Sequence, residues 1–453
     1  MRLFGRRPLY SSVMEVTADN LVDVIRSVID DFGRNRNEID YLYRYYRGDQ
    51  PVLRREKKIR PEICNRIVEN RANEIVSFKV GYLCGEPIQY VARKEASDAI
   101  IELNDLMLAC NKATKDKELV EWQMIAGTGY RMVVVDNPFD LYTLDPRDTF
   151  VIRSKRVGNK VLAGVYCGID ENGDDIYCVY TPTMYFECNG REVVKAEPHS
   201  LGAVPIIEYP ANNARLGAFE VVITILDAIN NVASNRIDGI EQFIQSLMIF
   251  YNCQLEEDVT PHDIRDFGAI FLKSNGQERA DLKILSEQLD QMQTQTLVDY
   301  MYQTMLTICG MPNRNGGSST SDTGAAVQMR DGYTSAEMRA KDSELMFKQG
   351  EIEMLKILLP ICNTLAGIDL ELSDIDIRFT RRHYENIVSK AQVLCEMLNN
   401  DKVDPRLAFA HCGMFTDAEE AYKDSMAWYE QQQAEMEKRL TDVQIGGQSA
   451  EAP

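Results

Sequence analysis

Two long amphipathic segments separated by a polar loop constrain the fold more than any other part of the chain. The first, residues 286–311, spaces its apolar side chains at helical intervals and ends in Gly310-Met311-Pro312, which is typical of a helix C-terminus followed by a breaker. The second starts at a capping serine or aspartate and keeps its apolar period as far as Pro360. Residues 313–321 contain no apolar side chain. We therefore expect two long helices that hold out a flexible, glycine-rich loop.

Length and cysteine usage indicate a large protein made in a reducing compartment. A chain of 453 residues has room for roughly two to four domains. Residues 1–8 are basic but lack the apolar stretch of a signal peptide, and no apolar run reaches the ~20 residues that cross a bilayer. The eleven cysteines include no Cys-x-x-Cys pair. This pattern favours free thiols in a cytoplasm over disulfides or a zinc site.

The formal charge of the chain is −20, and its isoelectric point is near 4.8. Proteins that bind nucleic acid tightly have the opposite, basic balance. If this protein meets DNA, we expect it not to hold it firmly.

Residues 15–215 predict one α+β domain. Helical periods occur at 15–47, from Pro61 to Val76, and at 97–126. Residues 161–209 alternate like successive hairpins with Asn-Gly turns.

The tract Tyr41–Arg47 interleaves arginine with aromatic residues, as a platform for stacked bases would. Tyr41 and Tyr45 are also four residues apart, so both can face a core while the arginines stay in solvent. We favour this packing interpretation.

Residues 218–247 predict a long amphipathic helix whose opposite face is polar. The next segment, 248–285, is too short to own a stable core, so we expect a neighbouring copy to complete it. Residues 384–440 predict helices, with Pro405 in a first turn, and the Gly- and Ser-rich composition from Thr441 onward predicts disorder.

Recognisable catalytic motifs are missing from the sequence. It contains no P-loop, no His-Glu-x-x-His and no Gly-x-Ser-x-Gly. Asp374 and Asp376 alternate on a predicted strand, where they would share a face and could hold a divalent metal. Solvated carboxylates are the favoured interpretation, because no third ligand is near. We expect no catalytic residues, no cofactor and no metal.

Several segments, taken in order, resemble the portal proteins of tailed bacteriophages, in the siphophage branch of Gram-positive hosts. Residues 73–76 (Asn-Glu-Ile-Val) lead to the pattern Gly81-Tyr82-Leu83-x-Gly85-x-Pro87-Ile88, and Val204-Pro205-Ile206-Ile207-Glu208-Tyr209 precedes the first long helix. The order helix, small module, helix, polar loop, helix is also similar. The resemblance covers roughly residues 15–430.

The resemblance implies an α+β, mainly α portal fold that forms rings. It divides the chain into an N-terminal arm at 1–14, a wing at 15–215, a first stem helix at 216–247, a clip at 248–285, a second stem helix at 286–311, a tunnel loop at 312–322, a tunnel helix with the return to the wing at 323–380, a helical crown at 381–440 and a disordered tail at 441–453.

It further implies a dodecameric ring at one vertex of the capsid. Such a ring is a channel for packaging and ejection of double-stranded DNA, which passes without specific binding. The implied partners are the large terminase subunit, head-completion or adaptor proteins, and the major capsid and scaffolding proteins, with no membrane. The protein would assemble in the cytoplasm of the host bacterium and reside at the portal vertex of the virion.

Three sets of residues are the predicted sites. The DNA-channel set is Asn313, Arg314, Asn315, Gly316, Gly317, Ser318 and Ser319, and the set that docks terminase or adaptor is Glu256, Glu257, Asp258, His262, Asp263, Arg265 and Asp266. The set at the contact between subunits is Ile237, Ile240, Phe243 and Ile244. The alternatives are another structural protein, such as a minor capsid protein, or a metal-dependent nuclease that uses Asp374 and Asp376.

Overall fold

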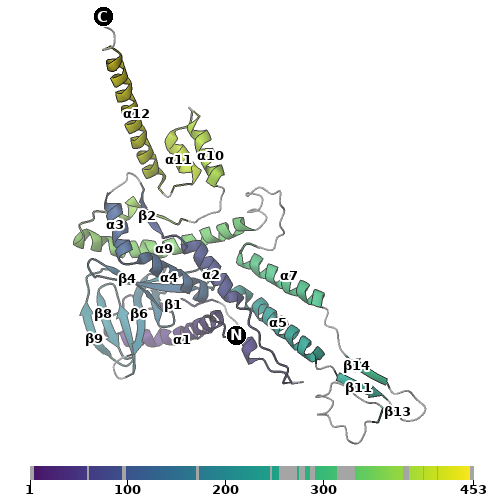
Figure 1. The fold of residues 1–453 in the computed structure, drawn as a ribbon. Helices are drawn as coiled ribbons and strands as arrows, with labels where there is room; N and C mark the ends of the chain where they lie inside the picture. The colour runs from purple at the N-terminus through teal and green to yellow at the C-terminus, as the bar shows by residue number, and fades with distance from the viewer. Residues whose placement is uncertain are drawn as a thin grey trace. The chain divides into compact units, whose positions relative to one another are not determined.

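The computed structural model shows an α+β, mainly helical fold (Figure 1). It describes residues 5–58, 61–93, 98–169, 173–244, 247–251, 253–254, 273–274, 281–285, 291–313, 332–380, 387–400, 402–415 and 417–448. Two compact units are present: unit 1 contains residues 1–46, 72–221 and 307–453, and unit 2 contains residues 47–71 and 222–306.

A six-stranded sheet and one long helix form the first core of unit 1. The strand order is β1 (Leu9–Ser11), β5 (Thr149–Ser154), β6 (Val161–Ile169), β7 (Asp175–Tyr180), β8 (Met184–Cys188) and β9 (Val193–Pro198). Helix α1 (Leu21–Tyr46) runs along this sheet (Figure 1). Its apolar stripe packs on the sheet, and the rings of Phe32 and Phe150 lie 4.3 Å apart. The hairpins predicted for 161–209 are therefore present.

A second, three-stranded sheet of unit 1 packs against two helices. Its order is β10 (Ile206–Pro210), β3 (Thr128–Val134) and β4 (Asp140–Leu144), and both neighbouring pairs are antiparallel. Helices α4 (Lys112–Ala126) and α9 (Tyr333–Leu365) pack against it.

Helix α9 continues past Pro360, where the sequence predicts its end. A proline inside a helix removes one backbone hydrogen bond and crowds the preceding turn. Here Ile357, Leu358, Leu359, Ile361 and Cys362 are all buried, and this burial outweighs the lost bond.

A small two-stranded sheet closes unit 1. Strand β2 (Gln89–Ala92) pairs antiparallel with β15 (Ile375–Arg378), and α3 (Asp98–Ala109) follows β2. Helix α2 (Arg71–Cys84) precedes them. The helix that the sequence places from Pro61 therefore begins ten residues later, at Arg71, because residues 64–70 are extended and bond to another helix, as described below.

The tyrosine tract belongs to the core of unit 1. Tyr45 is fully buried and stacks on Phe219, while Tyr43 stacks on Trp122 with ring centroids 5.2 Å apart. The Arg147 guanidinium lies 4.5 Å from the Tyr43 ring centre. The packing interpretation is confirmed for Tyr45, and Tyr41 is half-buried beside it, with the two ring centroids 6.0 Å apart, while Arg44 and Arg47 are exposed.

Unit 2 contains α5 (Ile223–Ile244), most of α7 (Gln291–Cys309) and the segment 47–71, which includes the short helix η1 (Pro51–Arg54). The Arg236 guanidinium donates a 2.9 Å hydrogen bond to Gln295 Oε1, which joins α5 to α7. Beyond α5, β11 (Leu247–Tyr251) pairs with β14 (Asp281–Leu285), and β12 (Cys253–Gln254) pairs with β13 (Lys273–Ser274). Helix α7 ends at Cys309 and is followed by Gly310, whose φ is +65°, as the sequence predicts for a helix C-terminus.

The C-terminal helices are α10 (Ile387–Leu398), α11 (Pro405–Cys412) and α12 (Ala418–Gln448). Pro405 is in the first turn of α11, and the Asp404 carboxylate caps that helix by accepting from Arg406 N at 2.9 Å. Helix α12 runs on to Gln448, into the segment for which composition predicts disorder. Across the described residues, no helix is long and apolar enough to cross a membrane.

Gly350 offers a test of how closely α9 approaches the second sheet. A Cβ atom at this position would lie 2.5 Å from the Tyr209 ring, so we expect Gly350→Ala to lower the free energy of unfolding by about 1–3 kcal/mol. Gly33→Ala in α1 is the control, because no heavy atom lies within 4 Å of its added Cβ and alanine is the better helix former. Calorimetric unfolding should show a lower Tm for the first variant and an equal or higher Tm for the second. Equal behaviour of the two variants would contradict the packing described here.

Candidate functional site

Most of the residues predicted for the channel loop and for docking lie outside the described part of the chain. Asn313 lies four residues after the end of α7, whereas Arg314 to Ser319 and the docking set from Glu256 to Asp266 are not among the described residues. Of the predicted subunit-contact residues, Ile237 and Ile240 lie three positions apart on α5 and are 39% and 48% exposed. Phe243 and Ile244 are in the same helix, but their side chains are outside the described set.

A row of buried polar side chains on α5 binds the backbone of residues 47–71, which we call the strap. Asn65 N donates to Asp238 Oδ1 at 2.7 Å, Ile67 N to Ser234 Oγ at 2.9 Å, and Glu69 N to Asn230 Oδ1 at 2.8 Å. Four helical residues rise about 6 Å and two extended residues span about 6.7 Å, so the two repeats match. The strap therefore runs antiparallel to α5 with its register set by side chains.

We call these three hydrogen bonds the ladder. Asp238, at one end of it, also pairs with positive charges of the strap. The residue is 2% exposed. Its carboxylate pairs with the Lys57 ammonium and with the Arg55 guanidinium at 3.0 Å, and it accepts a hydrogen bond from the Asn65 side-chain amide at 2.9 Å. Burial alone would raise the pKa of Asp238, but the hydrogen bonds from Lys57 and Asn65 hold that pKa below its ordinary value of 3.8. The group is ionised at neutral pH.

In unit 1, four buried charges join α9 to the second sheet. Glu351 of α9 accepts from Arg131 Nη1 at 3.0 Å and from Lys112 Nζ at 3.0 Å. Asp116 of α4 accepts from the same two cations, with Lys112 at 2.6 Å. All four side chains are at most 3% exposed, and two acids balance two bases.

Two tyrosines complete the network. Tyr209 donates to Glu351 Oε1 at 3.0 Å, and Tyr90 of β2 donates to Glu351 Oε2. Burial would raise the pKa of Glu351, yet Lys112 and Arg131 hold it below the ordinary value, so the carboxylate stays ionised. One α9 residue thus bonds to β2, β3, β10 and α4.

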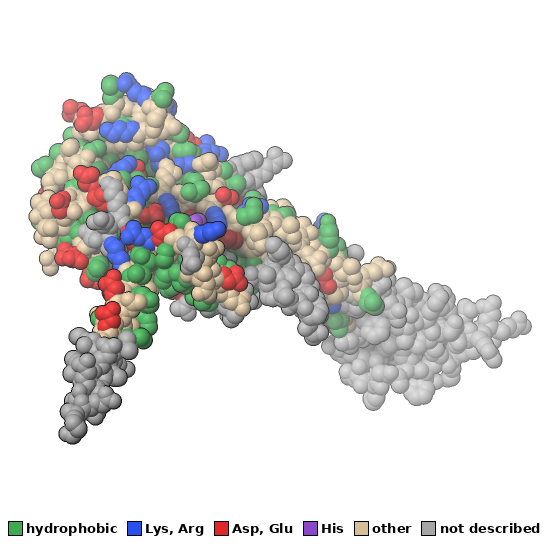
Figure 2. Space-filling model, turned by 90° about the horizontal axis from the view of Figure 1, so that it is seen from above, with side chains coloured by type: hydrophobic (Ala, Val, Ile, Leu, Met, Phe, Trp, Pro, Cys, Tyr) green, Lys and Arg blue, Asp and Glu red, His purple; other side chains and the backbone are tan. Residues whose placement is uncertain are grey.

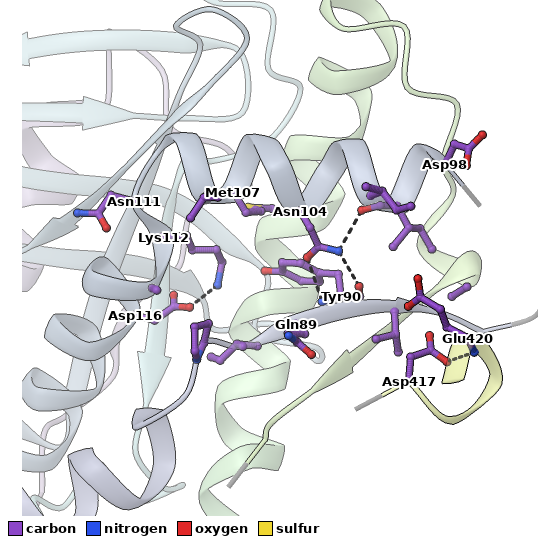
Figure 3. Close-up of a pocket in the computed structure, with 18 residues that line it drawn as sticks. Gln89, Tyr90, Asp98, Asn104, Met107, Asn111, Lys112, Asp116, Asp417 and Glu420 are labelled. Carbon is purple, nitrogen blue, oxygen red and sulfur yellow. Dashed lines mark hydrogen bonds and ion pairs between the residues drawn. The ribbon is translucent and has the colours of Figure 1, made fainter. Parts of the chain in front are cut away.

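A cavity of about 490 Å³ lies beside this network (Figure 3). β2, α3 and the start of α4 line it, with Asp417 and Glu420 at its edge. Asn104 projects from α3 and bonds both backbone groups of Tyr90, accepting from its N–H at 3.4 Å and donating to its carbonyl at 2.8 Å. These two bonds attach Tyr90 of β2 to α3.

The aspartates of the nuclease alternative have separate roles. Asp374 ends the short helix η3 (Leu372–Asp374) and caps it by accepting from Glu371 N at 3.1 Å. Asp376 is on β15 and pairs with Arg378 at 3.4 Å. They do not share the face predicted from alternation, because Asp374 precedes the strand. Among the described residues, no group of three potential ligands could hold a metal ion.

Sequence reasoning missed both buried polar sets. The α5 set does carry a signal: Asn230, Ser234 and Asp238 are small hydrogen-bonding residues at i, i+4 and i+8, which face one line along a helix. The polar face of α5 is therefore covered, although the sequence alone gives it no partner. For the α9 network the signal is weaker: Arg131 stands inside an otherwise apolar strand.

One protein family matches nearly the whole chain. The model of the family described as phage portal protein, SPP1 Gp6-like, matches residues 25–442. No curated protein matches the chain. Of the 114 chains in solved structures that match, one belongs to the neck of an empty GTA particle computed with C6 symmetry. It is 11% identical, with a TM-score of 0.44, over 83% of this chain and 94% of that chain.

The ladder predicts how the strap responds to loss of Asp238. Asp238→Ala removes the acceptor of one backbone amide and leaves two cations unneutralised, at a cost of about 1–3 kcal/mol. We expect trypsin to cut at the strap's lysines and arginines at least ~10-fold faster, since each 1.4 kcal/mol raises the open population tenfold. Asn231→Ala, at an exposed position on the same helix, is the control and should leave the rate unchanged. Equal rates for Asp238→Ala and wild type would show that the strap is held by other contacts.

The buried network predicts a large difference between two glutamates in α9. Glu351→Ala leaves Lys112 and Arg131 without one of their acids and should cost about 3–5 kcal/mol of unfolding free energy. Glu353→Ala removes only an exposed pair with Lys356 and should cost less than ~1 kcal/mol. Denaturant titration of both variants measures the difference. Similar values for the two would mean that the network adds nothing to the attachment of α9.

Proposed function

The chain belongs to the family of SPP1 Gp6-like phage portal proteins, and we propose that it forms the ring, expected to be dodecameric, through which double-stranded DNA enters and leaves the capsid. The observation that carries this proposal is the family match over residues 25–442. The family is structural, and membership makes the protein a phage head–tail connector of the virion. Assembly in the host cytoplasm is part of the proposal.

The proposed division of labour follows the elements. α5 and α7 are the stem, the strands between them are the clip, α9 is the tunnel helix, α10 to α12 are the crown, and the two larger sheets of unit 1 are the wing. The buried network supports the role of α9, because a helix that borders a channel must stay attached to the rest of unit 1 while DNA moves past it.

Two of the proposed contact sites lie in segments between the described elements. The loop containing Arg314 follows the duplex and offers exchangeable hydrogen bonds to phosphate, which position DNA without reading its sequence. The acidic segment from Glu256 to Asp266 docks the large terminase subunit during packaging and a head-completion protein afterwards. Capsid and scaffolding proteins are the further partners, and none of the proposed contacts involves a membrane.

Ring formation is proposed to bury the exposed apolar residues of α5. Ile237 and Ile240 keep 39% and 48% of their surface accessible in the single chain, although both continue the apolar stripe of the helix. A closed ring has one heterologous contact repeated around its axis. Burial of these side chains by the next subunit would contribute at about 25 cal/mol per Å².

Electron microscopy of the purified protein tests the proposal directly. We expect rings with a central hole for wild type, and loss of rings for Ile237→Asp and Ile240→Asp, because each places a charge in the apolar contact. Both residues are exposed in the single chain, so the variants should still fold. Asn231→Asp, also on α5 and exposed, adds the same charge elsewhere and should keep the rings. Normal rings from both isoleucine variants would remove α5 from the contact, and wild-type protein without rings would overturn the proposed function.

A further inference from the structure

The strap is the basic part of an acidic chain. Residues 47–71 contain eight Lys or Arg against four Asp or Glu, whereas the whole chain has 50 against 70. Among the described residues of this segment, Asp238 pairs with Arg55 and Lys57. The strap therefore keeps an excess of positive charge after its attachment to α5 is complete.

Four of the described strap cations are exposed to solvent: Arg47, which directly follows α1, and Arg54, Lys58 and Arg66 farther along the strap. Arg54 pairs with Asp49 at 2.6 Å, but both side chains are well exposed, and such pairs contribute at most about 1 kcal/mol and exchange readily. Arg66 donates to the Arg55 carbonyl through Nε at 3.2 Å. Its two terminal nitrogens carry the donors that a phosphate would bind.

Two of these cations lie on regular or fixed backbone. Arg54 is in η1, and the amides of Asn65 and Ile67, on either side of Arg66, are bound to α5 by the ladder, so binding of an anion by these two residues orders side chains and costs less conformational entropy. The face drawn in Figure 2, by contrast, intersperses acidic and basic side chains. Mixed charges of this kind do not produce a field of one sign.

We propose that the strap contacts the phosphate backbone of double-stranded DNA through Arg54, Lys58 and Arg66. The proposal rests on the proposed function, since it assigns the duplex a contact surface on unit 2. Cation–phosphate contacts are independent of sequence and exchange freely, and a few per subunit in an acidic chain allow a duplex to move.

An acidic protein is the competing partner, and the surface of the strap disfavours it. Stable protein interfaces are built around a desolvated apolar or aromatic core. Among the described strap residues, the large apolar side chains that reach solvent are Leu53 and Ile67, which are only 38% and 37% exposed. Duplex DNA needs no apolar core, because its charge density supplies the attraction.

The experiment measures binding of a labelled blunt DNA duplex to the full-length protein by fluorescence anisotropy over a salt series. We expect wild type to bind at about 50 mM salt and the triple variant Arg54→Glu, Lys58→Glu, Arg66→Glu to bind at least ~10-fold more weakly. The slope of log affinity against log salt should fall by about 0.9 for each lost phosphate contact. The milder variant Arg54→Gln, Lys58→Gln, Arg66→Gln should lie between the two, with helical content unchanged by circular dichroism.

A matched control separates the strap from the overall charge. Lys155, Arg156 and Lys160 are exposed between β5 and β6, and replacing all three by Glu changes the net charge by the same amount. We expect this control to keep most of the binding. Equal loss in both triple variants, or no loss in the strap variants, overturns the proposal. Wild type that binds poly-glutamate but not the duplex overturns it in favour of an acidic protein.

Microscopy distinguishes failure of this inference from failure of the proposed function. If rings form normally but bind no duplex, the proposed portal function is retained and the strap is excluded as a DNA contact. If the protein forms no rings but binds the duplex through the strap, the inference about the strap is retained and the proposed ring is excluded.

Discussion

A neutral set of four buried charges fixes helix α9, and the arrangement of unit 1 depends on it. Glu351 reaches Arg131 and Lys112 because the residue before it is Gly350, which lets the helix backbone approach the Tyr209 ring. Buried ion pairs add little net stability, since desolvation offsets much of their attraction. They are sensitive to geometry, however, because each displaced partner leaves a charge unsatisfied. The observed helix register brings Glu351 within reach of both cations, so a shift of α9 would break these pairs.

Unit 2 follows the same rule that a buried polar group must have a hydrogen-bond partner, and here the partners include backbone amides. Asn230, Ser234 and Asp238 would be costly to bury against an apolar surface, and they are buried because an extended backbone supplies one amide to each. The strap covers the side of α5 that carries these three residues, so the apolar stripe of the helix is left for other contacts. The stripe is buried at Leu226 and Ile229 and exposed at Ile237 and Ile240, so apolar surface is left accessible in its later part.

Periodicity predicts the elements where burial follows a single period, and it fails where a tertiary contact replaces a local rule. The helices α1, α5, α7 and the hairpins of 161–209 follow from spacing alone. Residues 64–70 carry helical spacing but are not helical, because α5 offers their amides better partners than a helix would. Pro360 stays inside α9 because its neighbours are buried. Arg131 has no local reason to be in a strand, and its partner Glu351 is 220 residues away.

Charge limits how such chains can assemble. Each subunit carries −20, and salt screens repulsion between exposed charges only beyond about 10 Å. Subunits that touch must therefore meet where carboxylates are sparse or already neutralised. Asp238 is such a carboxylate: Lys57 and Arg55 neutralise it, and it is one residue from Ile237 and two from Ile240. The ladder that attaches the strap thus also removes a negative charge beside the apolar residues of α5. In the proposed contact at Ile237 and Ile240, attachment of the strap and contact between subunits would thus be coupled through one side chain.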